Sequence, residues 1–172
     1  MKYFLFGMFF LVARVTFSTE DLVSVRKALE ASVTNSKTAD EFYKSVKLIE
    51  SGKPIIIGFK AMSELILCKH VINPISKLSH FQKGKDLLEK AIAIESENSE
   101  LRFYRYCTQL NVPGILNYSS NLKEDKKFLF NYIETQASNP KKDLDLYNRI
   151  KKFLLTNKHA TKEDKQKLIA LK

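Results

Sequence analysis

The stretch from Phe81 to Arg102, FQKGKDLLEKAIAIESENSELR, decides the fold class of this chain of 172 residues. Apolar residues recur in it at helical spacing as far as Ile94, and a polar turn follows. Asn98 can then cap a second helix, because an asparagine side-chain oxygen accepts hydrogen bonds from free N–H groups of the first turn. A helix, a short polar break and another helix predict an antiparallel helical hairpin.

The same succession continues along the chain in both directions, and the breaks fall at glycines and prolines. We therefore expect an all-α chain of antiparallel helical hairpins with about seven or eight helices. The segment 55–71 is apolar on more than one face and should form the most buried helix. The signals for the expected helices are the stripe Leu22, Val25, Leu29 and Val33; a capping box at Thr38–Glu41; Pro54 before 55–71; Leu78, Phe81, Leu88, Ala91 and Ile94 turned inward in 75–95; Asn98 before 101–110; Asn121 as a cap before Phe128; Leu144, Tyr147, Ile150 and Leu154; and a capping box at Thr161–Asp164.

Residues 81–102 also resemble the second helix and following turn of a tetratricopeptide repeat (TPR). The matching positions are an aromatic residue, two small residues and two apolar residues, namely Phe81, Gly84, Ala91, Leu88 and Ile94. Small residues allow a neighbouring helix to approach closely. Ser96 departs from the pattern, since it stands where the repeat usually has a turn proline. The resemblance implies a short TPR-like α-solenoid over residues 19–172, similar to small exported bacterial proteins, whose concave face binds a peptide or another protein.

Composition and charge exclude several classes of protein. Apolar residues make up 44% of the chain, too many for a disordered tail and too few for a polytopic membrane protein. The formal net charge is +10, but residues 19–139 hold 17 basic and 15 acidic residues, whereas residues 140–172 hold 10 basic and 4 acidic residues. This Lys-rich C-terminal helical pair is nearly free of arginine, unlike most nucleic-acid surfaces. We expect no nucleic-acid partner and at most weak contact with an anionic membrane surface.

Residues 1–18 have the order of a secretory signal peptide. Lys2 is followed by an unbroken apolar run from Tyr3 to Val12, and small residues follow. The run is too short to span a bilayer as a helix, which needs about 20 apolar residues. We expect cleavage before Thr19 and a periplasmic or secreted product. Because a charge such as Arg14 is uncommon there, an uncleaved N-terminal membrane anchor and a buried N-terminal helix stay open as alternatives.

The sequence contains no motif of catalysis. It has no Gly-rich phosphate loop, no nucleophile elbow and no Cys-x-x-Cys pair. Cys68, His70 and His80 could gather around a metal, but a buried thiol and two partly exposed imidazoles are the simpler interpretation. We therefore expect no enzyme activity, no cofactor and no bound metal.

Arginine and aromatic residues cluster on and just after the fifth expected helix. Arg102 and Arg105 are three residues apart and share a helix face. Arginine beside aromatic rings suits recognition of a carboxylate or phosphate on a partner. The candidate partner-binding residues are Arg102, Arg105, Tyr106, Asn111, Asn117 and Tyr118. The alternative is that both arginines pair with acids such as Glu100 or Asp125 and hold helices together.

Cys68 and Cys107 fall on the first helices of adjacent expected hairpins. In an oxidising compartment they could form a disulfide that closes a loop of about forty residues and adds a few kcal/mol of stability. The alternative is two reduced cysteines that pack as small apolar residues. The leading hypothesis from the sequence is an exported, non-catalytic, TPR-like protein–protein interaction module. A peripheral membrane protein and a small-ligand carrier are the alternatives.

Overall fold

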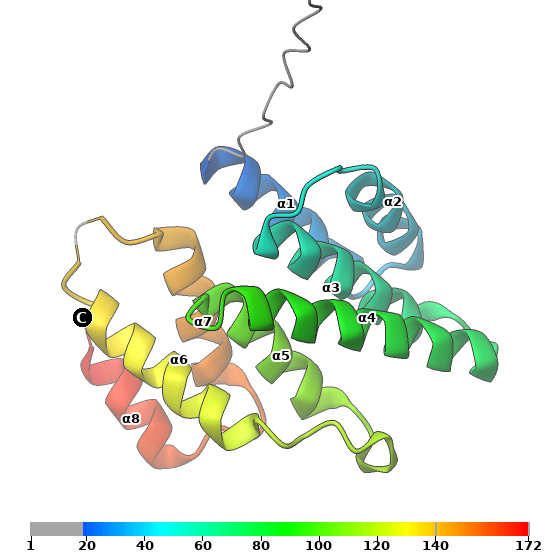
Figure 1. Ribbon diagram of the computed structural model, residues 1–172. Helices are drawn as coiled ribbons and strands as arrows, with labels where there is room; N and C mark the ends of the chain where they lie inside the picture. The colour runs from blue at the N-terminus through cyan, green and yellow to red at the C-terminus, as the bar shows by residue number, and fades with distance from the viewer. Residues whose placement is uncertain (1–18, 140, 172) are drawn as a thin grey trace, which may run out of the picture.

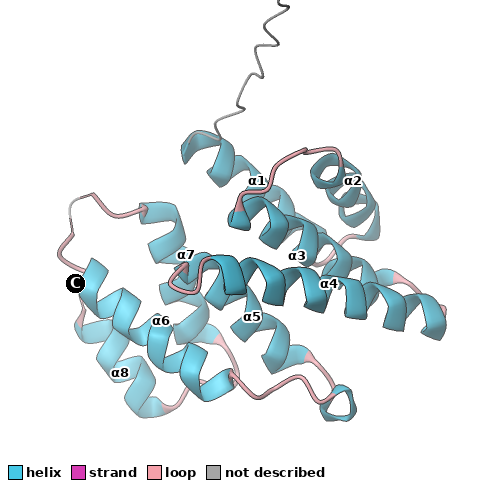
Figure 2. Cartoon of the chain, viewed as in Figure 1, coloured by secondary structure: helices cyan, strands magenta, loops and turns pink. Residues whose placement is uncertain are grey.

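A computed structural model describes residues 19–139 and 141–171, and all regular structure in them is helical (Figures 1 and 2). The prediction of an all-α chain with seven or eight helices is confirmed. The predicted signal peptide, residues 1–18, lies outside the described residues. None of the helices in the described ranges combines the length and apolar character that a membrane-spanning segment needs. The helices are α1 (Thr19–Ser32), α2 (Ser36–Lys47), α3 (Pro54–His70), α4 (Pro74–Ile94), α5 (Ser99–Asn111), the short 3-10 helix η1 (Gly114–Leu116), α6 (Leu122–Gln136), α7 (Leu144–Thr156) and α8 (Lys162–Ala170).

Polar side chains fix the beginnings of two helices as predicted. The Asn98 amide oxygen accepts hydrogen bonds from the N–H groups of Glu100 and Leu101 at 3.0 and 3.1 Å, which caps α5. Thr161 and Asp164 form the predicted capping box of α8. These caps satisfy N–H groups that a helix cannot bond internally.

Two other predicted caps are wrong. α2 begins earlier than predicted, because the Asn35 side chain accepts a hydrogen bond from the N–H of Thr38 at 3.0 Å. Thr38 therefore lies within the first turn, and the predicted box Thr38–Glu41 does not open the helix. Asn121 precedes α6 but makes no capping bond, since its amide oxygen accepts a hydrogen bond from the Gln109 side chain at 3.3 Å.

Most residues predicted to face inward are buried or half-buried, but four are exposed. Phe81 and Leu88 of α4 expose 4% and 0% of their surface, as predicted. Val33, Leu78, Ile94 and Leu144 expose 37%, 55%, 56% and 58%, so these four predictions are wrong. All four lie near a helix end, where neighbouring helices cover less of the surface than they do at the middle.

Each helix packs against the next along the chain, and the odd-numbered helices also meet one another (Figure 1). α3 contacts both α1 and α5. The ring of Phe103 on α5 meets the ring of Phe153 on α7 edge-on, with centroids 5.3 Å apart. The first helices of four consecutive hairpins therefore lie next to one another.

Two clusters of buried apolar side chains form the core, and α5 belongs to both. One cluster joins α2, α3, α4 and α5 and contains Phe59 and Leu101. The other joins α5, α6, α7 and α8 and contains Leu129 and Ile150. Phe103 of α5 packs against both clusters. The position of α5 between the two cores makes it the element on which both halves of the fold rest.

α5 is also the more deeply buried helix in proportion to its length. Eight of its 13 residues are buried, against eight of 17 in α3. The prediction that 55–71 forms the most buried helix is therefore wrong. Apolar spacing does not show the burial of α5, because many of its buried residues are polar or charged, namely Glu100, Arg102, Arg105, Thr108 and Gln109.

Small residues bring α4 directly onto α3. A Cβ added at Gly84 would lie 2.6 Å from Cγ of Leu65 and 2.9 Å from the backbone oxygen of Ala61. Ala91, two turns further along α4, is fully buried. The close approach predicted at Gly84 is confirmed, and Ala91 is buried as predicted.

Gly84→Ala is expected to lower the free energy of unfolding by about 1–2 kcal/mol, because overpacking against the α3 backbone exceeds the gain in helix propensity. Gly52→Ala is the control, since nothing lies within 4 Å of its added Cβ. Urea denaturation followed by circular dichroism measures both variants. A midpoint for G84A equal to that of the parent protein would contradict the close packing of α3 and α4.

Candidate binding groove

An open groove with a volume of about 610 Å³ lies between α1, α5 and α7. It opens to solvent and is not an enclosed cavity. Much of its lining is apolar and comes from all four odd-numbered helices and the residue after α1, namely Leu29, Val33, Met62, Phe103, Leu146 and Phe153. We take this groove as the candidate functional site, because apolar side chains from several helices converge on it.

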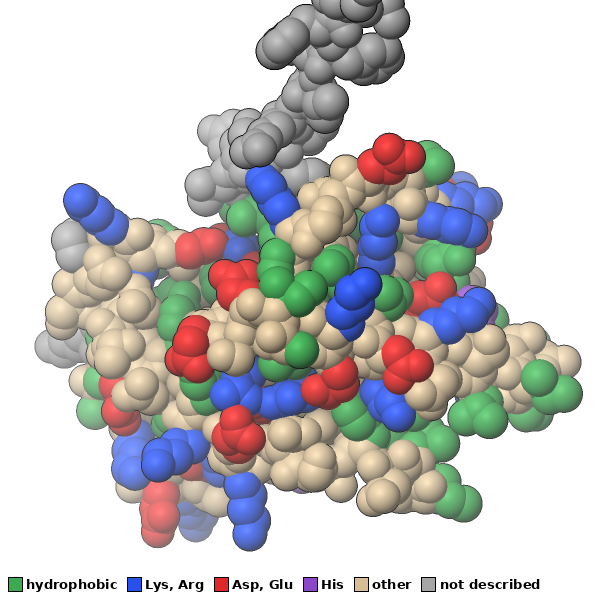
Figure 3. All heavy atoms as spheres, viewed as in Figure 1, with side chains coloured by type: hydrophobic (Ala, Val, Ile, Leu, Met, Phe, Trp, Pro, Cys, Tyr) green, Lys and Arg blue, Asp and Glu red, His purple; other side chains and the backbone are tan. Residues whose placement is uncertain are grey.

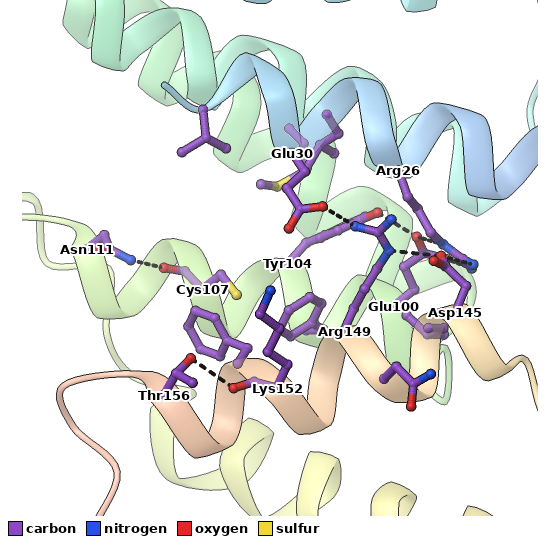
Figure 4. A pocket seen from close by; sticks show the side chains of 17 residues that line it. Arg26, Glu30, Glu100, Tyr104, Cys107, Asn111, Asp145, Arg149, Lys152 and Thr156 are labelled. Carbon is purple, nitrogen blue, oxygen red and sulfur yellow. Dashed lines mark hydrogen bonds and ion pairs between the residues drawn. The ribbon is translucent and has the colours of Figure 1, made fainter. Parts of the chain in front are cut away.

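The three helices along the groove run in the same direction. At one end, Arg26 of α1 meets Glu100 in the first turn of α5 and Asp145 in the first turn of α7 (Figure 4). At the other end, Asn111 and Thr156 are the last residues of α5 and α7. Each even-numbered helix runs antiparallel to the odd-numbered helices beside it, so the odd-numbered helices run parallel to one another. We call these ends the ion-paired end and the C-terminal end.

Arg26 holds the ion-paired end together. Its Nε and Nη2 donate to the two carboxylate oxygens of Glu100 at 2.7 and 2.6 Å. Its guanidinium also lies 2.9 Å from Asp143 and 3.2 Å from Asp145. Burial by itself lowers the pKa of Arg26, but the hydrogen bonds and charges of Glu100 and Asp143 outweigh burial and raise the pKa. The guanidinium therefore stays charged and fully paired.

Arg149 joins α7 to α1 beside this cluster (Figure 4). Its Nη1 donates to Glu30 at 2.7 Å and its Nε donates to Asp145 at 2.8 Å. The Tyr104 hydroxyl donates to Glu100 at 2.5 Å, and burial followed by the charge of Glu100 raises the pKa of this tyrosine. The first and fourth hairpins are thus bonded directly to each other across the groove.

Lys152 also lines the groove and is charged, but it takes no part in these ion pairs. Its side chain is exposed and extends from α7 into the groove toward α5 and α1 (Figure 4). Within the described part of the chain, its ammonium has no hydrogen-bond or ion-pair partner. Asn111 and Thr156 nearby are already bonded, since they donate to the carbonyls of Cys107 and Lys152 at 2.8 and 2.9 Å. The C-terminal end therefore offers apolar surface and one unpaired cation.

The predicted patch of Arg102 and Arg105 is not an exposed surface. The two arginines expose 8% and 4% of their surface and donate to Asp125 of α6, which is fully buried. Arg105 binds both carboxylate oxygens of Asp125, at 2.7 and 2.8 Å, and donates to Glu89 of α4 at 3.0 Å. Arg102 also donates to Glu124 at 2.7 Å. The alternative interpretation is therefore the correct one: both arginines hold α4, α5 and α6 together.

The other four predicted binding residues are dispersed. Tyr106 is buried in the cluster of α5 to α8. Tyr118 is 8% exposed, and its hydroxyl donates to Glu89 at 2.5 Å. Asn117 is exposed and has a left-handed backbone, with φ of 45°. Of the six predicted residues, Asn111 lines the groove.

Both cysteines are free thiols, so the structure contains no disulfide between Cys68 and Cys107. Cys107 lines the groove, and burial raises the pKa of its thiol, which keeps it protonated near neutral pH. His80 lies 2.5 Å from Glu64, and His70 bonds to a carbonyl in the last turn of α1. Among the described residues, no group of three or more histidine, cysteine and acidic side chains could hold a metal ion.

A second, shallower hollow of about 430 Å³ lies between α6 and α8. Lys123, Lys126 and Lys127 of α6 line it together with Lys167 of α8, and Lys126 pairs with Asp164 at 2.6 Å. Basic side chains gather at the lower left of the face shown in Figure 3, where α6 and α8 lie. Lysines of α6 thus extend the Lys-rich surface of the C-terminal helices, which charge counting along the sequence did not predict.

No family model, no curated protein and no solved structure matches the chain. The function of the groove is therefore inferred from the residues that line it.

One residue of the groove could have been found from the sequence. Arg26 stands at helical spacing from Leu22, Leu29 and Val33, so a charge interrupts the apolar stripe of the first helix. A charge on a buried stripe needs a buried partner. No comparable signal marks Lys152, because a lysine on an amphipathic helix is most often an exposed solubilising residue.

Asp125→Asn is expected to lower the free energy of unfolding by about 3–5 kcal/mol, because it leaves two buried guanidinium groups without their shared carboxylate. Asp40→Asn is the matched control: it removes an exposed ion pair with Lys44, 2.5 Å long, and should leave stability nearly unchanged. Chemical denaturation measures both variants. If D125N were as stable as D40N, Arg102 and Arg105 would not be holding the helices together.

Proposed function

We propose that the protein is a non-catalytic interaction module that binds a segment of another protein in the groove between α1, α5 and α7. The observation that carries the proposal is the groove itself, open to solvent and lined by apolar side chains from four odd-numbered helices. Exposed apolar surface with a polar rim is typical of interaction sites. A small-ligand carrier would be favoured by an enclosed cavity, whereas an open groove accommodates a chain that continues beyond it.

We also propose that the architecture is a short TPR-like stack. The proposal is supported by the resemblance of residues 81–102 and by the layer that α1, α3, α5 and α7 form along the groove. Stacked helical hairpins commonly present such a layer as a concave binding surface. The direct bonds between the first and fourth hairpins depart from a simple stack, in which each repeat contacts only its neighbours.

The chemistry of the groove lining supports a role in binding without catalysis. Its one thiol, Cys107, has a pKa raised by burial, so it is a poor nucleophile near neutral pH. No histidine lies among the described lining residues to act as its general base. The acids of the lining are bonded to Arg26 and Arg149 and hold helices together.

Export is part of the proposal and is supported by the order of residues 1–18. Mass spectrometry of protein recovered outside the cytoplasm should find a mature N-terminus near Thr19. Leu5→Arg should block export by placing a charge in the apolar run, whereas the conservative Leu5→Ile should not. An intact Met1 in the membrane fraction would contradict cleavage and favour a membrane-anchored protein.

Binding in the groove can be tested by selecting ligands for the purified protein from a displayed library of random dodecapeptides. Val33→Asp places a charge on the apolar lining at a residue that is 37% exposed, and it should weaken the selected peptides at least tenfold, about 1.4 kcal/mol. Ile115→Asp is the matched control, because Ile115 is 93% exposed and lies outside the groove. Fluorescence polarisation measures the affinities. Equal affinity for both variants, or the selection of no peptide, would contradict the proposal.

A further inference from the structure

We propose that the segment bound in the groove presents a carboxylate to the ammonium of Lys152. This inference rests on the proposed function, since it names the chemistry of the occupant of that groove. It predicts both the composition of the partner segment and where in the groove its charge lies.

The charge distribution of the groove singles out Lys152. Six charged residues line the groove, and five of them are bonded to one another or to Asp143, namely Arg26, Glu30, Glu100, Asp145 and Arg149. Lys152 is the sixth, and within the described residues no acid pairs with it. Among the lining residues, an incoming anion therefore finds one cation that no acid of the described residues pairs with.

Docking itself makes a partner for Lys152 necessary. The side chain extends into a groove whose lining includes Phe103 and Phe153 (Figure 4). A segment that fills the groove removes water from the ammonium, and burial of an unpaired charge opposes binding. A segment with an apolar or basic group at this position is therefore disfavoured. A segment with an anion there replaces the lost hydration by a charge-assisted hydrogen bond.

The surroundings of Lys152 fit a singly charged anion. α1, α5 and α7 direct their C-terminal ends to this part of the groove, and helix C-termini carry partial negative charge. His70 and Lys69 bond to the carbonyls of Ser32 and Val33 and so offset this charge at α1. The two arginines of the lining are not free to grip a phosphate with a bidentate fork, since Arg26 and Arg149 are already bonded to acids. One ammonium matches one carboxylate.

The same arrangement of charges sets the orientation of the bound segment along the groove. At the ion-paired end, Glu100 and Asp145 beside Arg26 would repel a further carboxylate. Glu30, in the last turn of α1, is bonded to Arg149, and from there toward Asn111 and Thr156 the described lining residues include no acid. The carboxylate of the partner therefore lies near Asn111 and Thr156, with the apolar part of the segment directed toward Leu29 and Leu146.

The carboxylate can come from the C-terminus of a chain or from an Asp or Glu side chain, and synthetic peptides separate the two sources. Peptides selected on the parent protein are made as free acids, as C-terminal amides, and with each acidic side chain replaced by its amide. One of these neutralisations should weaken binding to the parent protein at least tenfold. The same neutralisation should change binding to Lys152→Met less than twofold, because the ammonium is then absent. The neutralisation that weakens binding shows whether the carboxylate is the C-terminus or an acidic side chain of the peptide.

Charge reversal provides the second arm. Lys152→Glu should lose the acidic peptides and gain affinity for versions in which lysine replaces the critical acid. Lys165→Glu is the matched control, because it makes the same change of charge at an exposed position of α8 outside the groove. Circular dichroism and thermal unfolding confirm that both variants are folded, which is expected because Lys152 is exposed and makes no side-chain bond.

The outcomes distinguish this inference from the proposed function. If peptides bind and lose affinity with Val33→Asp, but neither neutralisation nor Lys152→Glu changes their affinity, the groove is a binding site and the role of Lys152 is overturned. If no peptide depends on Val33, both proposals fall. A tenfold loss on neutralisation that disappears in Lys152→Met supports both.

Discussion

The fold depends on the buried charges of α5. Glu100 binds Arg26 of α1, and the arginines at 102 and 105 share Asp125 of α6. These bonds point in opposite directions from one helix, so α5 is fixed between the two apolar clusters at a defined rotation about its axis. Apolar contacts alone tolerate small rotations, because they are not directional, whereas a bidentate guanidinium and carboxylate pair tolerates little. Such pairs add little net stability compared with apolar packing, but they make misplacement of the helix costly.

This rotation of α5 determines what the groove contains. With Glu100 held by Arg26, the face that carries Phe103, Cys107 and Asn111 lines the space between α1 and α7. The arginines face the opposite side, toward α4 and α6. The side chains that look most suited to recognition in the sequence are therefore the ones that the fold uses internally. Recognition is left to apolar residues and to a single lysine.

The sequence predicts the helices well and the placement of charge poorly, for one physical reason. Helix boundaries follow from local signals, such as the cap at Asn98 or the box at Thr161, and these are confirmed. Whether a charged residue is buried depends on partners far away in the sequence, and spacing within one helix does not contain that information. Asp125 illustrates this, since nothing local distinguishes it from the exposed acids around it. Only a charge within an apolar stripe, as at Arg26, gives a local hint.

The bonds between α1 and α7 affect how the chain folds and how many hairpins it can hold between them. Arg149 and Glu30 are 119 positions apart in the chain, as are Arg26 and Asp145. Contacts of such separation form late, after the hairpins between them have been ordered, and they slow folding relative to a chain of purely local contacts. In an array of hairpins without such bonds, single hairpins could unfold one at a time from either end. The bonds between the first and the fourth hairpin oppose this, because either of these hairpins can unfold only if these bonds break. A hairpin inserted between the first and the fourth would separate these partners, so the number of hairpins between them is fixed by these bonds.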